Sequence, residues 1–128
     1  MANHVIDPDG IAPPAAAYAH AVVSDAPARM LHTSGVVPTR PDGTVATDIA
    51  DQAREVWRTI GALLDDAGLA PTDIVSVTTY VVPGQDLGAV MAARDAVLDG
   101  HLAASTLVVV AELARREWLM EVAVVAVR

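Results

Sequence analysis

Two aliphatic runs near the end of the chain place the strongest constraint on its fold. Leu107–Ala111 and Val122–Val127 contain only valine, alanine and leucine. Short runs rich in valine are typical of strands, and the absence of polar alternation indicates that both faces of each strand are buried. The sequence therefore predicts a sheet that needs cover on both sides.

Two helices are predicted to supply this cover on one side. Between residues 49 and 67, apolar side chains recur at spacings of three and four, which gives a helix one apolar stripe. Asp48 is the expected N-cap, and Gly68 followed by Pro71 is the expected end. A second helix is predicted from Asp86 to Leu98.

The predicted strands alternate with these helices. They are expected at residues 18–24, 30–36, 74–82, 105–111 and 117–127. The order is β-β-α-β-α-β-β, and crossover connections place both helices on one face of a mixed sheet. We therefore expect an α+β fold in a single domain over residues 1–128, whose residues 1–16 form an irregular arm. The other sheet face stays bare unless copies of the chain associate, so a homo-oligomer is expected.

Composition narrows the possible partners. The net charge is 8 − 16 = −8 and lysine is absent, which argues against binding nucleic acid. The absence of cysteine excludes disulfides and thiolate zinc sites. No apolar run approaches the roughly 20 residues of a membrane helix, and the start lacks the basic residues of a signal peptide. We therefore expect a cytoplasmic protein that does not bind membranes.

The first two predicted strands suggest a hairpin that turns about Pro27. In that register His20 faces Ser34 and Val22 faces His32, so Tyr18, His20, His32 and Ser34 share one face. A slip of one residue would disperse them. Two neighbouring imidazoles are compatible with a metal site, but no third ligand is evident. Ordinary hydrogen-bonded histidines are therefore expected, and no metal.

Three further positions are candidates for chemistry. Glu121 interrupts the last aliphatic strand, so it either faces solvent at a sheet edge or faces a polar cleft, where it could position water or shuttle a proton. Arg94 lies on the apolar side of the second helix and either extends to the rim or points into a pocket, where it could hold a carboxylate. Ser34-Gly35 either forms a simple turn or lets a ligand approach the backbone closely.

Most of the sequence resembles one known family. The stretch HTSGVVPTRPDGTVATDIADQAREVWRTIGALLDDAGLAPTDIVSVTTYV and the ending MEVAVVAVR are similar to the RidA/YjgF family of reactive-intermediate (enamine/imine) deaminases. The resemblance runs from about Tyr18 to Arg128 and includes Ser34–Pro38 and the Gln52-Ala53 pair. It implies a chorismate-mutase-like protomer, assembled as a homotrimer with ligand clefts between neighbouring subunits. In such clefts a small enamine or imine is hydrolysed to a keto acid and ammonia, and we expect no cofactor.

The resemblance also implies roles for individual residues. The family's cleft tyrosine matches Tyr18, its strand-end Ser-Gly pair matches Ser34 and Gly35, and its late-strand glutamate matches Glu121. Glu121 and Tyr18 are therefore the expected catalytic residues, and Ser34 and Gly35 are expected to contact the substrate.

The arginine that holds the substrate carboxylate in this family is missing. The family motif Pro-Ala-Arg-Ser or Pro-Ala-Arg-Thr aligns with residues 103–106, so Ser105 replaces the arginine and Thr106 follows it. On the second helix, Met91 stands where asparagine is common, and Arg94 where an aromatic residue is expected. Ser105, Thr106, Met91 and Arg94 are further expected substrate contacts. A charge-assisted clamp is worth about 1.5–3 kcal/mol, so general 2-aminoacrylate deaminase activity should be weak or absent.

Two functions remain compatible with these differences from the substrate-binding residues of the family. The first is a RidA-family enzyme of altered specificity, acting on an enamine, imine or related reactive intermediate that lacks the usual carboxylate or is held by Arg94. The second is a noncatalytic trimeric module on the same fold that binds metabolites or another protein. A ribonuclease role, sometimes attached to this family, fits poorly with a charge of −8 and no lysine.

Overall fold

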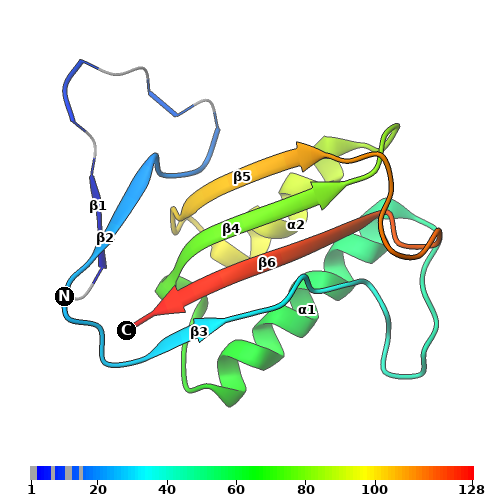
Figure 1. Cartoon of the computed structure of the whole chain (residues 1–128), viewed down its shortest axis with the longest axis horizontal. Coiled ribbons are helices and arrows are strands. Elements are labelled where there is room, and N and C mark those ends of the chain that lie inside the picture. The colour runs from blue at the N-terminus through cyan, green and yellow to red at the C-terminus, as the bar shows by residue number, and fades with distance from the viewer. Residues whose placement is uncertain (1–2, 7, 11–12, 15) are drawn as a thin grey trace.

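The main sheet of the protein has four strands. The computed structural model describes residues 3–6, 8–10, 13–14 and 16–128. In the order β3-β6-β4-β5, the strands of this sheet are Met30–His32, Met120–Val127, Ile74–Val81 and Ala104–Val109. β4 and β5 are parallel, whereas β3 and β4 both run antiparallel to β6 (Figure 1). The predicted mixed sheet is confirmed.

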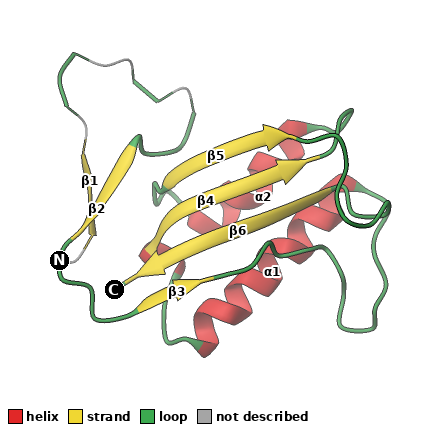
Figure 2. Cartoon of the chain, viewed as in Figure 1, coloured by secondary structure: helices red, strands yellow, loops and turns green. Residues whose placement is uncertain are grey.

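Both helices lie on the same side of this sheet (Figure 2). They are α1, Ile49–Asp66, and α2, Leu87–Leu98, and a short 3₁₀ helix, η1, spans Pro71–Asp73. The predicted caps of α1 are confirmed, because the Asp48 carboxylate accepts from the Asp51 amide at 3.2 Å and Gly68 adopts a left-handed φ of 71°. The predicted α+β arrangement, with two helices on one face of a mixed sheet, is therefore correct.

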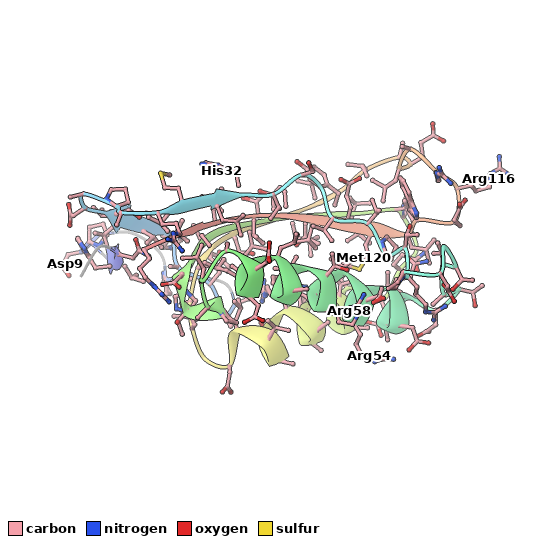
Figure 3. The ribbon with its side chains drawn as sticks, turned by 90° about the horizontal axis from the view of Figure 1, so that it is seen from below. Asp9, His32, Arg54, Arg58, Arg116 and Met120 are labelled. Atoms are coloured by element: carbon pink, nitrogen blue, oxygen red, sulfur yellow. The ribbon has the colours of Figure 1, made fainter. Side chains whose placement is uncertain are left out.

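The hydrophobic core fills the space between the sheet and the helices. Met120, Val122 and Val124 of β6 alternate toward α1, and Trp57 and Ile60 meet them from the helix. In Figure 3, Met120 lies between the sheet and the helices, whereas His32 projects from the opposite face. Strand alternation thus divides each strand into a buried row and a row on the uncovered face.

The uncovered face carries half-buried side chains of the two central strands. Tyr80 of β4 and Glu121, Ala123 and Val125 of β6 lie there. Within the described residues, no helix covers this face (Figures 1 and 3).

The predicted hairpin about Pro27 is wrong. β2, Ala21–Ser24, pairs instead with β1, Asn3–Ile6, in a separate two-stranded sheet, and β3 pairs with β6. Pairing with β6 packs Leu31 against the core, and this burial of apolar surface stabilises the observed arrangement. His20 therefore does not face Ser34, and the predicted face of Tyr18, His20, His32 and Ser34 does not form. The irregular structure predicted for residues 1–16 is also wrong for Asn3–Ile6.

The ends of the later strands differ modestly from the prediction. β6 begins at Met120, not at residue 117, and β5 ends at Val109 before a loop that extends to Leu119. Within the described residues, neither helix is long and apolar enough to cross a bilayer.

Candidate active site

A hollow of about 270 Å³ lies on the uncovered face of the sheet. Two strands, β4 and β6, supply its floor, and the loop after β5 and the segment after β3 supply its walls. Its lining residues are Gly35, Tyr80, Val110, Glu112, Leu113, Glu121 and Ala123. The predicted catalytic carboxylate therefore lies in a concave site and not at a sheet edge.

The position of the Glu121 carboxylate depends on Gly35. Val36 exchanges two backbone hydrogen bonds with Val122, at 2.7 and 3.1 Å, which brings the preceding glycine next to Glu121. A Cβ atom at residue 35 would overlap Oε2 of Glu121. The absence of a side chain at Gly35 thus allows the Glu121 side chain of the same protomer to approach. The half-buried carboxylate packs against the backbone of Gly35.

Tyr80 and Glu112 are site residues that the sequence reasoning missed. Tyr80 is the direct cross-strand partner of Glu121, and Glu112 lies in the loop after β5. Alternation in IVSVTTYVV places Tyr80 on one face of its strand, but only the register between β4 and β6 places it beside Glu121. No local signal marks Glu112.

Ser105 and Arg94 form a second cluster, on the helix side of the sheet. Ser105 pairs with buried Val77 in the parallel register of β4 and β5, so it faces α2. Nη1 of Arg94 donates to Oγ of Ser105 at 3.3 Å, and Nε donates to Oδ1 of Asp95 at 2.9 Å. Arg94 is only 7% exposed, so it does not extend to the rim as a free surface cation.

The remaining predicted contacts lie around this second cluster or beside the hollow. Met91 is half-buried, one turn before Arg94, whereas Thr106 is exposed on the opposite face of β5 from Ser105. Ser34 is exposed immediately before Gly35.

Tyr18 lies at the edge of β5. The Ala19 amide donates to the carbonyl of Ala103 at 2.8 Å, and Ala19 forms a parallel bridge with Ala104. The Tyr18 ring meets His20 edge-on, with centroids 6.0 Å apart. Tyr18 thus belongs to the segment that borders the start of β5, close to Ser105 along the strand.

One protomer does not bring all the predicted site residues together. Glu121 and Gly35 lie on the uncovered face, whereas Ser105 and Arg94 lie on the face that the helices cover. Among the described residues, no three His, Cys, Asp or Glu side chains are arranged to hold a metal ion. What the hollow does offer is the Glu121 carboxylate held against the backbone of Gly35, with the Tyr80 phenol on the neighbouring strand.

Comparison with known proteins identifies the family. The family model described as Endoribonuclease L-PSP matches residues 10–128, which is most of the chain. The 2-iminobutanoate/2-iminopropanoate deaminase of Salmonella typhimurium is 34% identical over 102 residues, covering 77% of this chain and 80% of the relative. The chain belongs to the RidA/YjgF family. The resemblance seen in the sequence is therefore confirmed.

Solved structures of RidA/YjgF proteins share the whole fold. YyfB from Yersinia pestis, a Rid-family protein of unknown function, matches over 100% of both chains with a TM-score of 0.89 and 30% identity. The Escherichia coli protein TdcF, solved with bound serine, matches over 98% of both chains with a TM-score of 0.72 and 27% identity. A RidA/YjgF relative thus binds a small molecule on this scaffold.

Proposed function

We propose that this RidA/YjgF protein is a cytoplasmic, single-domain enzyme that hydrolyses the C–N bond of a small imine or enamine. The observation that carries the proposal is the Glu121 carboxylate seated against Gly35 in the hollow of the uncovered face. The similarity to 2-iminobutanoate/2-iminopropanoate deaminases supports this class of reaction. A net charge of −8 favours a small molecule over nucleic acid as the partner.

Glu121 would serve as the group that handles water and protons. A carboxylate accepts a hydrogen bond from water, and it can take a proton as the water oxygen attacks the imine carbon. The C=N double bond becomes a single bond, and the proton taken by Glu121 passes to the nitrogen. The C–N bond of the resulting amino alcohol then breaks, which releases ammonia, leaves a carbonyl compound and regenerates the carboxylate. Tyr80, beside Glu121, and Tyr18 offer hydroxyl groups that could donate to the substrate. No cofactor is needed for this hydrolysis.

The charges near the site favour a substrate without a carboxylate. Ser105 replaces the family arginine, and Arg94, which donates to Ser105, is already paired with Asp95. The hollow itself contains two acidic residues, Glu112 and Glu121, and no basic residue among its described lining. A protonated imine fits such surroundings, whereas an anionic imino acid would be repelled.

The separation of the two clusters supports a site shared between subunits. Glu121 and Gly35 face away from the helices, and Ser105 and Arg94 face toward them, so a complete site needs a second protomer. We infer a homotrimer in which the hollow of one protomer meets the β5 edge of its neighbour. Ser34 would border the cleft on one side, and Met91 and Thr106 on the other.

The proposal is tested by supplying two kinds of imine. An amino acid oxidase acting on alanine generates 2-iminopropionate, and an amine oxidase acting on propylamine generates an imine without a carboxylate. The expected result is at least tenfold greater acceleration, over buffer, for the propylamine-derived imine. Strong activity on 2-iminopropionate would contradict the altered specificity but not the deaminase class. No acceleration of either imine would favour the noncatalytic binding module.

The Ser105→Arg variant sharpens this comparison. Restoring a guanidinium at the family's position should raise the activity toward 2-iminopropionate and should not raise that toward the propylamine-derived imine, which has no carboxylate for the guanidinium to hold. Ser24→Arg, a substitution in the separate β1–β2 sheet, is the matched control and should change neither activity.

A further inference from the structure

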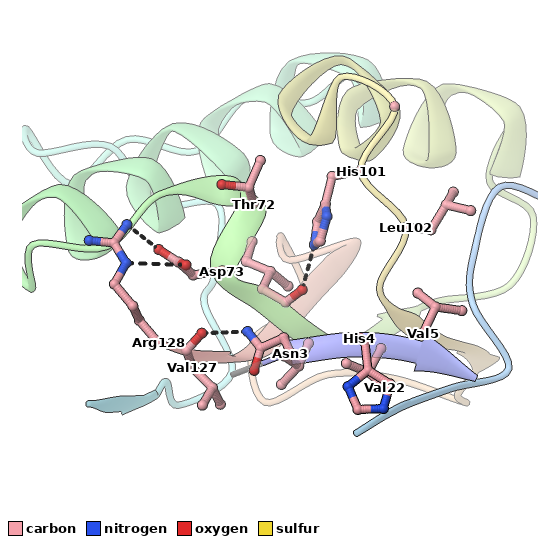
Figure 4. Close-up of a pocket in the computed structure, with 13 residues that line it drawn as sticks. Asn3, His4, Val5, Val22, Thr72, Asp73, His101, Leu102, Val127 and Arg128 are labelled. Atoms are coloured by element: carbon pink, nitrogen blue, oxygen red, sulfur yellow. Dashed lines mark hydrogen bonds and ion pairs between the residues drawn. The ribbon is translucent and has the colours of Figure 1, made fainter. Parts of the chain in front are cut away.

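A second cavity, larger than the hollow, lies between the separate two-stranded sheet of β1 and β2 (the β1–β2 hairpin) and the end of the main sheet. It lies away from Glu121. Its volume is about 520 Å³, within the 300–1,000 Å³ typical of small-molecule pockets. One wall comes from β1 and β2, and the other from the start of β4, the loop before β5 and the end of β6 (Figure 4). None of the proposed catalytic or substrate-binding residues lines it.

The walls of this cavity are mainly apolar. Ile74 and Val127 are fully buried behind it, and Val22 is half-buried on the hairpin side. Val5 and Leu102 line it on opposite walls, yet they are 48% and 40% exposed (Figure 4). Binding of an apolar molecule would remove these exposed apolar side chains from water, which lowers the free energy of the complex.

The charged groups of the lining already have partners. Asp73 and Arg128 pair through two contacts, of 2.6 and 3.3 Å, and Arg128 also donates to the carbonyl of Gly68 at 3.1 Å. His4 lies 3.5 Å from the carboxylate of Asp25. A charged ligand would enter without a free counter-charge among the described lining residues, and its desolvation would be uncompensated. The cavity therefore favours an uncharged ligand.

His101 is a polar residue of the lining, and its hydrogen bond indicates which of its ring nitrogens carries the hydrogen. Its Nε2 lies 2.7 Å from the carbonyl oxygen of Ile74 (Figure 4). A carbonyl only accepts, so Nε2 carries the hydrogen, and in the corresponding neutral tautomer the other ring nitrogen, Nδ1, is an acceptor. A ligand with one hydroxyl or N–H donor would match this ring.

We propose that the cavity between the β1–β2 hairpin and the main sheet is a second small-molecule site. Its ligand is an uncharged, largely apolar molecule with a single hydrogen-bond donor, such as a substituted phenol. The site is independent of the hydrolysis proposed above, because it shares no residue with the hollow around Glu121.

Three probes of similar size test the chemistry by NMR titration of the full chain. 4-Ethylphenol carries the donor, 4-ethylanisole lacks it, and 4-ethylbenzoate adds a charge. We expect 4-ethylphenol to shift the amides of residues 3–5, 72–75 and 100–102, with 4-ethylanisole at least threefold weaker and 4-ethylbenzoate at least tenfold weaker. Shifts confined to other residues, no binding at millimolar concentrations, or equal binding of the benzoate would overturn the proposal.

A filling substitution tests the location. Val22→Trp should abolish 4-ethylphenol binding, because the indole would occupy the cavity. Val109→Trp is the matched control, since Val109 is 54% exposed and does not line the cavity. Unchanged binding to a folded Val22→Trp protein would overturn the proposal, and the shift map of the unsubstituted protein keeps it testable if that variant does not fold.

Discussion

At the scale of single residues, the absence of a side chain at Gly35 determines where the Glu121 carboxylate rests. Gly35 does not have a positive φ, so its backbone alone does not require glycine. The requirement comes from Oε2 of Glu121, which occupies the place of a Cβ atom. The end of a glutamate side chain moves readily, so a substitution here should affect the position of the carboxylate more than the stability of the fold.

Gly35→Ala should therefore separate activity from stability. The alanine Cβ displaces the carboxylate, so imine hydrolysis should fall at least tenfold, while the free energy of unfolding changes by less than about 1 kcal/mol. Activity assays and chemical denaturation measure the two effects. Gly61→Ala, on α1 with no atom near the added Cβ, is the control and should retain activity.

Glu121→Gln should remove the proton acceptor while keeping the shape of the side chain. We expect a loss of roughly 100-fold or more in turnover, the usual size of a general acid–base contribution. The control is Glu117→Gln, an exposed carboxylate outside the hollow. Unchanged turnover in Glu121→Gln would remove this residue from the mechanism.

At the scale of secondary-structure elements, α1 is fixed at both ends by its own sequence. Asp48→Ala should lower the free energy of unfolding by about 1 kcal/mol, because the Asp51 amide loses its acceptor. Asp66→Ala is the matched control: it removes an exposed carboxylate from the last turn, where the helix dipole disfavours negative charge. Thermal or chemical denaturation should show no loss of stability in this second variant.

Gln52 joins α1 to the loops around it. Its buried amide donates to the carbonyls of Ala46 and Glu117, at 2.7 and 2.8 Å, and its oxygen accepts from the Leu119 amide at 2.9 Å. The Gln-Ala pair that supported the family resemblance thus positions the segment leading into β6 and Glu121.

Gln52→Leu should be strongly destabilising, because three backbone groups, the carbonyls of Ala46 and Glu117 and the Leu119 amide, lose their partner on this buried side chain. We expect a loss of about 3 kcal/mol or more in the free energy of unfolding, measured by chemical denaturation. Gln85→Leu changes a half-buried glutamine outside the helices and should cost far less. A similar loss in both variants would contradict the role of the Gln52 hydrogen bonds.

At the scale of the whole molecule, the uncovered sheet face is the surface most suited to self-association. Val125 and Ala123 lie on it, beside the hollow that contains Glu121. Light scattering should give the mass of three protomers. Val125→Arg should shift this mass toward one protomer while circular dichroism stays unchanged, because a buried guanidinium without a partner disfavours the interface. Ala62→Arg, exposed on α1, should leave the mass at three protomers.

A trimeric site would also link assembly to activity. Because Glu121 and Ser105 lie on opposite faces of one sheet, the Val125→Arg protein should lose hydrolysis together with its assembly. Full activity in a monomeric variant would place the entire site within one protomer.

The helices and their ends could be predicted because they depend on neighbouring residues. The apolar spacing of residues 49–67, the Asp48 cap and the left-handed Gly68 act within a few positions along the chain. The same holds for β4 and for the aliphatic core of β6. The family resemblance also came from the sequence. It predicts a site that includes Glu121 and Gly35, and in the structure these two residues are in contact.

Strand pairing was decided by the tertiary structure. A single sequence does not show that β3 gains more from the long edge of β6 than from a hairpin with β2, because that comparison involves residues nearly 100 positions apart. The same long-range register put Tyr80 beside Glu121 and created the cavity between the two sheets. By itself, the sequence determined the helices, the α+β class and the family, since these rest on local periodicity and motifs. The tertiary structure alone determined which side chains meet, because distant strands compete for the same hydrogen-bonding edges and only one pairing buries the most apolar surface.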